Sequence, residues 1–158
     1  MNTFKRKLNI LKKRKINKKI NNFFDWIKGA ELVELKSCDI KEDPVRPELD
    51  VIFRRSYGRK IFGVKYKKEI CAIMCFGFTD EVPRTVKELD LMTRDAYLRS
   101  AQRDQNIGKI AIAYTIWSKK RGGGKLIVKE VFKMIKKSNH LNRLITLSPL
   151  TEMARNFH

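Results

Sequence analysis

The sequence predicts a mixed α/β domain (mixed α+β). Three observations predict it. Strand-like apolar runs recur along the chain, an amphipathic helical run follows the strongest of them, and the expected elements come in the order β, α, β, β, β, α, β, α. The 158 residues are 42% hydrophobic, which excludes a fully disordered chain and leaves enough apolar surface for one core without a disulfide or metal.

Residues 1–28 predict a basic helical extension in front of a domain that spans residues 29–158. The first 20 residues carry nine Lys and Arg and no acid, and apolar residues recur there at helical spacing. We expect one or two amphipathic helices that dock on the domain through Phe23, Phe24 and Trp26, since these rings favour burial. Residues 5–19 alternatively offer a surface to an anionic partner.

The next elements are expected between residues 31 and 79. Residues 31–37 alternate as a strand does, and a polar connection with two prolines follows at 39–47. A helix is expected to begin at Pro47 and to end at Tyr57–Gly58. Residues 60–67 and 69–79 predict an antiparallel pair of strands with a turn at Lys67–Lys68.

The segment of residues 80–106 is polar, with a helical patch near residues 86–98. Residues 109–118 (Lys-Ile-Ala-Ile-Ala-Tyr-Thr-Ile-Trp-Ser) are the strongest strand signal in the chain. This strand is expected to lead directly into the segment that carries the chemistry.

A glycine-rich basic loop at residues 119–124 follows the strongest strand. The amphipathic helix expected at 125–138 should place five apolar residues inward: Leu126, Val128, Val131, Phe132 and Ile135. Residues 144–148 predict a short buried strand, and another helix is expected to begin at Thr151.

The glycine-rich loop lies between a strand and a helix, an arrangement that suits a phosphate. Residues 119–125 read Lys-Lys-Arg-Gly-Gly-Gly-Lys. Glycines let a ligand approach the backbone, and a helix amino terminus offers unpaired N–H groups and a positive partial charge. The spacing does not match the Walker A motif, and the loop comes too late in the chain for the Rossmann fingerprint. A tight turn without a ligand is the alternative interpretation.

The loop resembles a known family. Lys119-x-x-Gly122-x-Gly124 is similar to the Gln/Arg-x-x-Gly-x-Gly/Ala loop with which GNAT acyltransferases bind the pyrophosphate of acyl-CoA, although Lys119 departs at the first position. Thr151-x-x-Ala154-x-x-Phe157-His158 resembles the family's second CoA-contacting helix, with Thr151 in place of Asn. The resemblance implies a GNAT-like fold, in which helices flank a mixed, largely antiparallel sheet. It also implies acetyl-CoA as the acyl donor and an amine acceptor. The family fold continues with two further strands, so we expect this chain to be a fragment that lacks them.

The resemblance also implies site residues. The cofactor would be bound by the end of the strand, the loop and the second helix, namely Ile116, Trp117, Ser118, Lys119, Arg121, Gly122, Gly123, Gly124, Lys125 and Thr151. His158 stands where the family has its general-acid Tyr, and Tyr114 is a second candidate for the acid. Three carboxylates at strand ends remain open as the base: Glu69, Asp80 and Glu81.

Residues 146–150 (Thr-Leu-Ser-Pro-Leu) are similar to a stretch of malonyl-CoA decarboxylase, whose catalytic domain is a GNAT relative. If this likeness extends to mechanism, Ser148 would be a catalytic serine; alternatively, Ser-Pro ends the strand and caps the next helix. A decarboxylase-like enzyme is therefore the alternative to an amine acyltransferase. A third alternative is a basic module without activity that binds nucleic acid or an assembly.

The remaining expectations concern metals, location and assembly. The three cysteines (Cys38, Cys71 and Cys75) lack paired zinc-ligand spacing, so we predict buried reduced thiols and no metal. No apolar run reaches the length of a membrane span, and the amino terminus lacks a signal core. We therefore expect a soluble, cytoplasmic protein. The acceptor is expected to be a small-molecule or protein amine, and an open sheet edge favours a homodimer.

Overall fold

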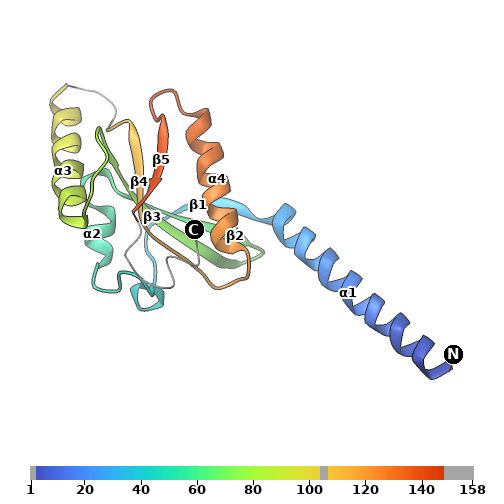
Figure 1. The fold of residues 1–158 in the computed structure, drawn as a ribbon. Coiled ribbons are helices and arrows are strands. Elements are labelled where there is room, and N and C mark those ends of the chain that lie inside the picture. Colours follow the sequence, from blue (N-terminus) through green and yellow to red (C-terminus); the bar gives the residue numbers. More distant parts are fainter. Residues whose placement is uncertain (1–2, 104–106, 148–158) are drawn as a thin grey trace.

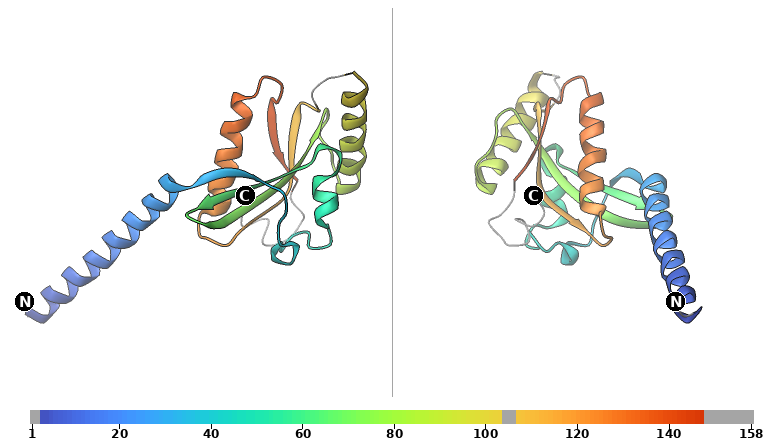
Figure 2. Two further views of the ribbon diagram at one scale, coloured as in Figure 1. Left: turned by 180° about the vertical axis from the view of Figure 1, so that it is seen from behind. Right: turned by 45° about the vertical axis from the view of Figure 1, so that its right-hand side comes forward.

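The computed structural model describes residues 3–103 and 107–147, which form a twisted sheet with helices on both faces and one long projecting helix (Figures 1 and 2). Within these residues the sheet has five strands in the order β1-β2-β3-β4-β5. The first three pairs are antiparallel and β4 and β5 are parallel. The strands are β1 (Glu31–Leu35), β2 (Lys60–Tyr66), β3 (Glu69–Thr79), β4 (Ile110–Ser118) and β5 (Arg143–Thr146), and the helices are α1 (Thr3–Gly29), α2 (Val51–Arg55), α3 (Val86–Arg103) and α4 (Gly123–Lys137).

The predicted fold class is confirmed. The mixed α+β architecture, the mostly antiparallel sheet and the hairpin of β2 and β3 through Lys67 all follow the sequence patterns. The helix expected at Pro47 instead begins at Val51, because the Asp50 carboxylate accepts the Phe53 N–H at 2.7 Å and caps the helix there. The helical patch expected to end at residue 98 continues to Arg103.

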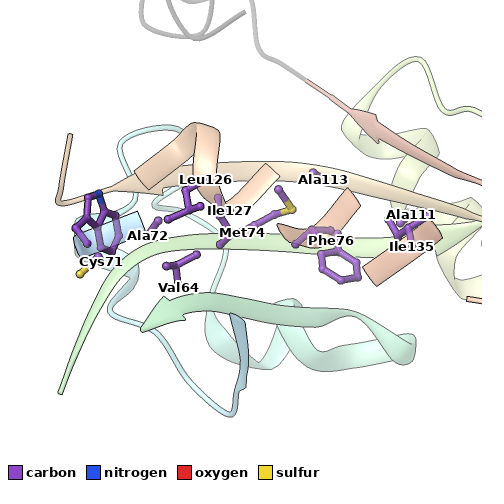
Figure 3. Close-up of a cluster of buried hydrophobic side chains, with 12 residues drawn as sticks. Val64, Cys71, Ala72, Met74, Phe76, Ala111, Ala113, Leu126, Ile127 and Ile135 are labelled. Atoms are coloured by element: carbon purple, nitrogen blue, oxygen red, sulfur yellow. The ribbon is translucent and has the colours of Figure 1, made fainter. Parts of the chain in front are cut away.

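Two clusters of buried side chains fill the two faces of the sheet. The α4 face packs Leu126, Ile127 and Ile135 against β3 and β4, as Figure 3 shows. The opposite face packs Leu89 of α3 and Phe53 of α2 against alternate strand residues. The prediction that Phe132 points inward is wrong: it is 46% exposed, because one residue turns it about 100° away from the buried Val131. Ile127 takes the inward position instead.

Helix α1 departs from the expectation that its aromatic residues dock. Only Trp26 is buried, where it packs edge-to-face on Tyr66 with 5.4 Å between ring centroids. Phe23 and Phe24 remain 44% and 54% exposed. The rest of the helix extends away from the domain, because only its last turn reaches the sheet (Figures 1 and 2). Within the described residues, no helix is long and apolar enough to span a membrane.

A bulge in β4 shapes the sheet next to the glycine loop. Cys75 pairs with Thr115 while the next residue, Phe76, pairs with Ala113, so Tyr114 is the extra residue. The extra residue lets Tyr114 and Thr115 both face the α2 side of the sheet.

A buried ion pair joins this bulge to the connection between β1 and α2. The guanidinium of Arg54 donates to the Asp43 carboxylate at 2.9 Å, and both side chains are completely buried. Asp43 also accepts the Thr115 hydroxyl at 2.8 Å and the N–H groups of Val45 and Arg46. Arg54 further donates to the carbonyl of Leu49 at 2.8 Å. The connection between β1 and α2 is thereby fixed on the sheet by polar contacts in addition to the packing of Cys38 and Leu49.

We predict that Arg54→Met lowers the free energy of unfolding by about 3 to 5 kcal/mol, because it leaves Asp43 charged, buried and unpaired. Glu34→Gln is the matched control: it breaks the exposed Glu34–Lys60 pair and should cost less than about 1 kcal/mol. Urea unfolding of both variants measures the difference. Equal losses would contradict the central role of the buried pair.

Candidate functional site

The glycine loop leaves β4 from a fixed junction. The Lys119 N–H donates to the Cys71 carbonyl at 2.8 Å, and the Ser118 hydroxyl lies 3.1 Å from the same carbonyl. Cys71 is the extra residue of a bulge in β3, since Val64 pairs with Ala72 and Lys65 with Ile70. The Lys120 N–H in turn donates to the Ser118 hydroxyl at 3.2 Å. These bonds hold the chain as it turns from the strand into α4.

Two of the glycines are required by the fold itself. Gly122 has a φ of 82°, a left-handed conformation that favours glycine. A Cβ at Gly123 would lie 2.3 Å from the Ser118 hydroxyl oxygen and 3.2 Å from the Cβ of Ala72. The missing side chain at Gly123 therefore lets α4 approach β3 and β4, whether or not a ligand is present.

The amino terminus of α4 retains the features that suit a phosphate. Among the described residues, no hydrogen-bond acceptor pairs with the N–H groups of Gly124 and Lys125, as expected for the first turn of a helix. Arg121 and Lys125 are exposed beside them. This end of α4 thus combines free donors, the positive end of the helix dipole and two cations.

The other two basic residues of the loop are engaged elsewhere. The Lys119 ammonium lies 2.7 Å from a Glu42 carboxylate oxygen. The Lys120 ammonium lies 4.8 Å and 4.6 Å from the ring centroids of Trp26 and Tyr66, in cation–π geometry. Arg121 and Lys125 are therefore the better candidates for contacts with an anion.

The strand in front of the loop has an open edge. β5 pairs with β4 only from Ile110 to Ala113, and the last contact is the Leu147 N–H on the Ala113 carbonyl at 2.8 Å. β4 continues to Ser118, and among the described residues no strand covers its second half on that side. Ile116, Trp117 and Ser118 thus lie on a backbone edge that an extended ligand could join.

Tyr114 lies at the bulge with its ring buried on the α2 face, edge-to-face with Phe53. Burial raises the pKa of its phenol well above the ordinary value. Within residues 3–103 and 107–147 its hydroxyl has no hydrogen-bond partner. A higher pKa keeps the phenol protonated at neutral pH but makes it a weaker proton donor than an ordinary tyrosine, so it is the position of Tyr114 in β4, and not its pKa, that keeps this residue a candidate for the general acid.

The candidate carboxylates lie at opposite ends of the sheet. Glu69 begins β3, and this end of β3 lies beside the loop, because Ala72 pairs with Ser118. Asp80 and Glu81 follow the other end, where Thr79 pairs with Ile110, and Asp80 pairs with Arg99 at 2.9 Å. Of the three, the structure brings only Glu69 near the loop. Ser148, Thr151 and His158 lie outside the described residues.

Arg46 is a site residue that the sequence reasoning missed. Its Nε donates to the carbonyl of Tyr114 at 2.8 Å, which places a half-buried guanidinium at the bulge. Burial lowers its pKa, and among the described residues no carboxylate lies within ion-pair distance of it. The available signal was Asp43-Pro44-Val45-Arg46: an Asp before Pro favours a turn closed by its own side chain, which fixes the residues that follow.

The cysteines are free thiols. Cys71 and Cys75 are buried as predicted, whereas Cys38 is only half-buried. Cys38 and Cys75 share a hydrogen bond that lowers the pKa of Cys38 to about 7 and, together with burial, raises that of Cys75. The described part of the chain contains no group of three or more His, Cys, Asp or Glu that could hold a metal ion.

Comparisons with known proteins support the fold alone. No protein-family model matches the sequence, and no curated protein matches it. Among solved structures, the chain is similar to a malonyl-CoA decarboxylase from Cupriavidus metallidurans, with a TM-score of 0.52 and 20% identity over 82% of this chain and 33% of that one. The chain thus spans about a third of the decarboxylase. A ribosomal-protein-alanine N-acetyltransferase from Brucella melitensis biovar Abortus 2308 has a TM-score of 0.48 and 11% identity, over 82% of this chain and 88% of that one.

The chain thus shares with part of that decarboxylase a mixed α+β fold, in which helices lie on both faces of a mostly antiparallel sheet. The likeness to the decarboxylase shows that this fold also occurs in an enzyme named for a CoA thioester.

We predict that the rate at which iodoacetamide alkylates Cys38 rises with a midpoint near pH 7, because Cys75 donates to the thiolate of Cys38. Cys75→Ala removes the donor and should move the midpoint up toward the value of an ordinary thiol, about 8.5. Mass spectrometry of the labelled peptides follows Cys38 separately from the buried thiols. A midpoint near 8.5 in the unchanged protein would contradict the contact.

Proposed function

We propose that this domain binds an acyl-CoA, acetyl-CoA in the first place, and transfers the acyl group to an amine of a small molecule or a protein. The observation that carries the proposal is the position of the glycine loop. It opens α4 directly after the half of β4 that β5 leaves uncovered. One end of the site therefore suits a diphosphate and the adjoining edge suits an extended amide chain.

Each part of the site would bind a different part of the acyl-CoA. The N–H groups of Gly124 and Lys125, with the Arg121 and Lys125 side chains, would hold the diphosphate. The β4 edge from Ile116 to Ser118 would hydrogen-bond the pantetheine amides as an added strand does. A bound acyl-CoA supplies an activated thioester whose carbonyl an amine can attack. Tyr114 or His158 would give the proton that the leaving thiolate needs. The proton of the amine would leave through water, because Glu69 lies at the diphosphate end of the site, beyond the pair of Ala72 and Ser118.

The first test replaces the two cations without touching the packing of α4. Arg121→Glu with Lys125→Glu should weaken acetyl-CoA binding about a hundredfold or more, because two charge-assisted contacts become repulsive. An acidic residue at position 125 lies in the first turn of α4, where it favours the helix, and Arg121 precedes the helix, so the variant should fold. Titration calorimetry at constant ionic strength measures the affinity.

Lys129→Glu with Lys133→Glu is the matched control, because it makes the same charge change on exposed positions further along α4. Its affinity for acetyl-CoA should change by less than about threefold. Equal losses in the two variants would contradict the loop as the binding site. Gly123→Glu is not a clean probe, since its Cβ would collide with Ser118.

A decarboxylase-like reaction is the second candidate, and Arg46 favours it. A half-buried guanidinium at the bulge, next to the open edge of β4, could pair with the free carboxylate of a malonyl group. The fold that the chain shares with part of a malonyl-CoA decarboxylase also supports this second candidate. This candidate predicts that malonyl-CoA yields acetyl-CoA and CO2 without any amine.

We predict that Arg46→Gln weakens malonyl-CoA binding about tenfold or more, because it removes the charge that pairs with the carboxylate. Acetyl-CoA, which lacks the carboxylate, is the internal control, and its affinity should change little. Competition binding of the two ligands measures the ratio. If Arg46→Gln leaves the ratio of the malonyl-CoA and acetyl-CoA affinities unchanged, Arg46 does not bind the carboxylate. If the unchanged protein binds malonyl-CoA no more tightly than acetyl-CoA, amine transfer remains as the proposed function.

A further inference from the structure

Helix α1 presents a long surface that the domain does not use. Every residue from Lys7 to Asp25 is exposed, and only Trp26 in the last turn is buried. At about 1.5 Å per residue, the 27-residue helix is about 40 Å long. Figures 1 and 2 show it projecting from the edge of the domain where β1 begins.

This surface is strongly cationic, and large apolar side chains are exposed between the cations. The helix contains ten Lys and Arg and a single acid, Asp25. From Lys7 to the end of the helix, none of the basic side chains forms an ion pair with a carboxylate of the described residues. Pairs of cations four residues apart, such as Arg14 with Lys18 and Lys15 with Lys19, destabilise an isolated helix. An anionic partner would relieve this repulsion.

The arrangement of the apolar residues disfavours a lipid surface. A helix that lies in a membrane interface separates an apolar face from a charged one. Here the apolar residues form no single face: at 100° per residue, the exposed Leu8 and Leu11 lie about 120° around the helix from the exposed Ile16, Ile20 and Phe23. Insertion of one of these two stripes would leave the other in water and would draw flanking cations such as Lys12 and Lys15 toward the hydrocarbon.

The cationic surface continues onto the domain. Phe23 of α1 lies against the glycine loop, because a Cβ built on Gly122 would be 3.4 Å from its ring. Lys120 of the loop sits over Trp26, and Arg121 is exposed beside it. The helix and the loop therefore form one basic path that suits a polymer of phosphates better than a compact anion.

We propose that α1 binds the phosphate backbone of a nucleic acid without reading its base sequence. The cations are spread around the helix and would contact phosphates on more than one side, whereas no polar side chain is arranged to read one base. Binding displaces condensed counterions, so its strength depends steeply on salt. The proposal does not depend on the acyl-CoA site.

The test measures binding of a fluorescein-labelled DNA duplex of 20 base pairs, and of a single strand of equal length, by anisotropy at several salt concentrations. Replacing Lys12, Lys13, Arg14 and Lys15 together by Gln should reduce the slope of log affinity against log salt by about 3 to 4 for the duplex. Replacing Lys129, Lys133, Lys136 and Lys137 by Gln removes the same charge from α4 and should leave the slope within about 1 of the original.

Circular dichroism adds a second readout: without nucleic acid, both variants should keep the helix content of the unchanged protein, since α1 is already a helix. An equal reduction of the salt slope in the two variants would overturn the proposal, because the net charge of the protein and not α1 would then determine the binding. Stronger binding to phosphatidylserine vesicles than to either nucleic acid would also overturn it. So would a protein that binds no nucleic acid and instead forms a dimer that Ile16→Asp abolishes. Acetyl-CoA affinity in the α1 variant should be unchanged, which keeps this test separate from that of the proposed function.

Discussion

The buried ion pair between Asp43 and Arg54 is the constraint on which the candidate site depends. Two charges at zero exposure are stable only when each has its partners, and here Asp43 has Thr115 and two backbone N–H groups besides Arg54. The pair fixes the connection between β1 and α2 against the bulge of β4. That connection carries Arg46 to the carbonyl of Tyr114, so the same interaction builds the core and sets one wall of the site.

Two bulges and one glycine then determine where α4 begins. The bulge in β3 places the Cys71 carbonyl where it accepts hydrogen bonds from the Lys119 N–H and the Ser118 hydroxyl. These bonds fix the chain where it leaves β4. Gly123 allows α4 to pack directly on that exit. The free N–H groups at the start of α4 therefore stand at the end of the uncovered β4 edge. The free N–H groups of a helix amino terminus and an open strand edge thus adjoin as a consequence of packing alone.

The elements with strong local signals could be predicted from the sequence, and the contacts between distant segments could not. The strands at 60–67, 69–79 and 109–118 and the helix after the glycines follow apolar periodicity and turn residues, and the structure confirms them. Asp43 and Arg54 are 11 positions apart, and Thr115, which also binds Asp43, is 72 positions from it. No local sequence pattern predicts contacts over such separations. The exposure of Phe23 and Phe24 was missed because spacing shows that a helix is amphipathic but not whether a partner covers it.

Binding of acyl-CoA at the loop is the central claim, and thermal unfolding with acetyl-CoA tests it most directly. Pyrophosphate at the same ionic strength serves as the control for charge, since the basic chain attracts any anion. A ligand at 100 times its dissociation constant should stabilise the protein by about 2.7 kcal/mol, which raises the unfolding temperature by several degrees. We expect a clear shift with acetyl-CoA and a small one with pyrophosphate. Equal shifts would contradict the claim and leave a general anion site at the start of α4.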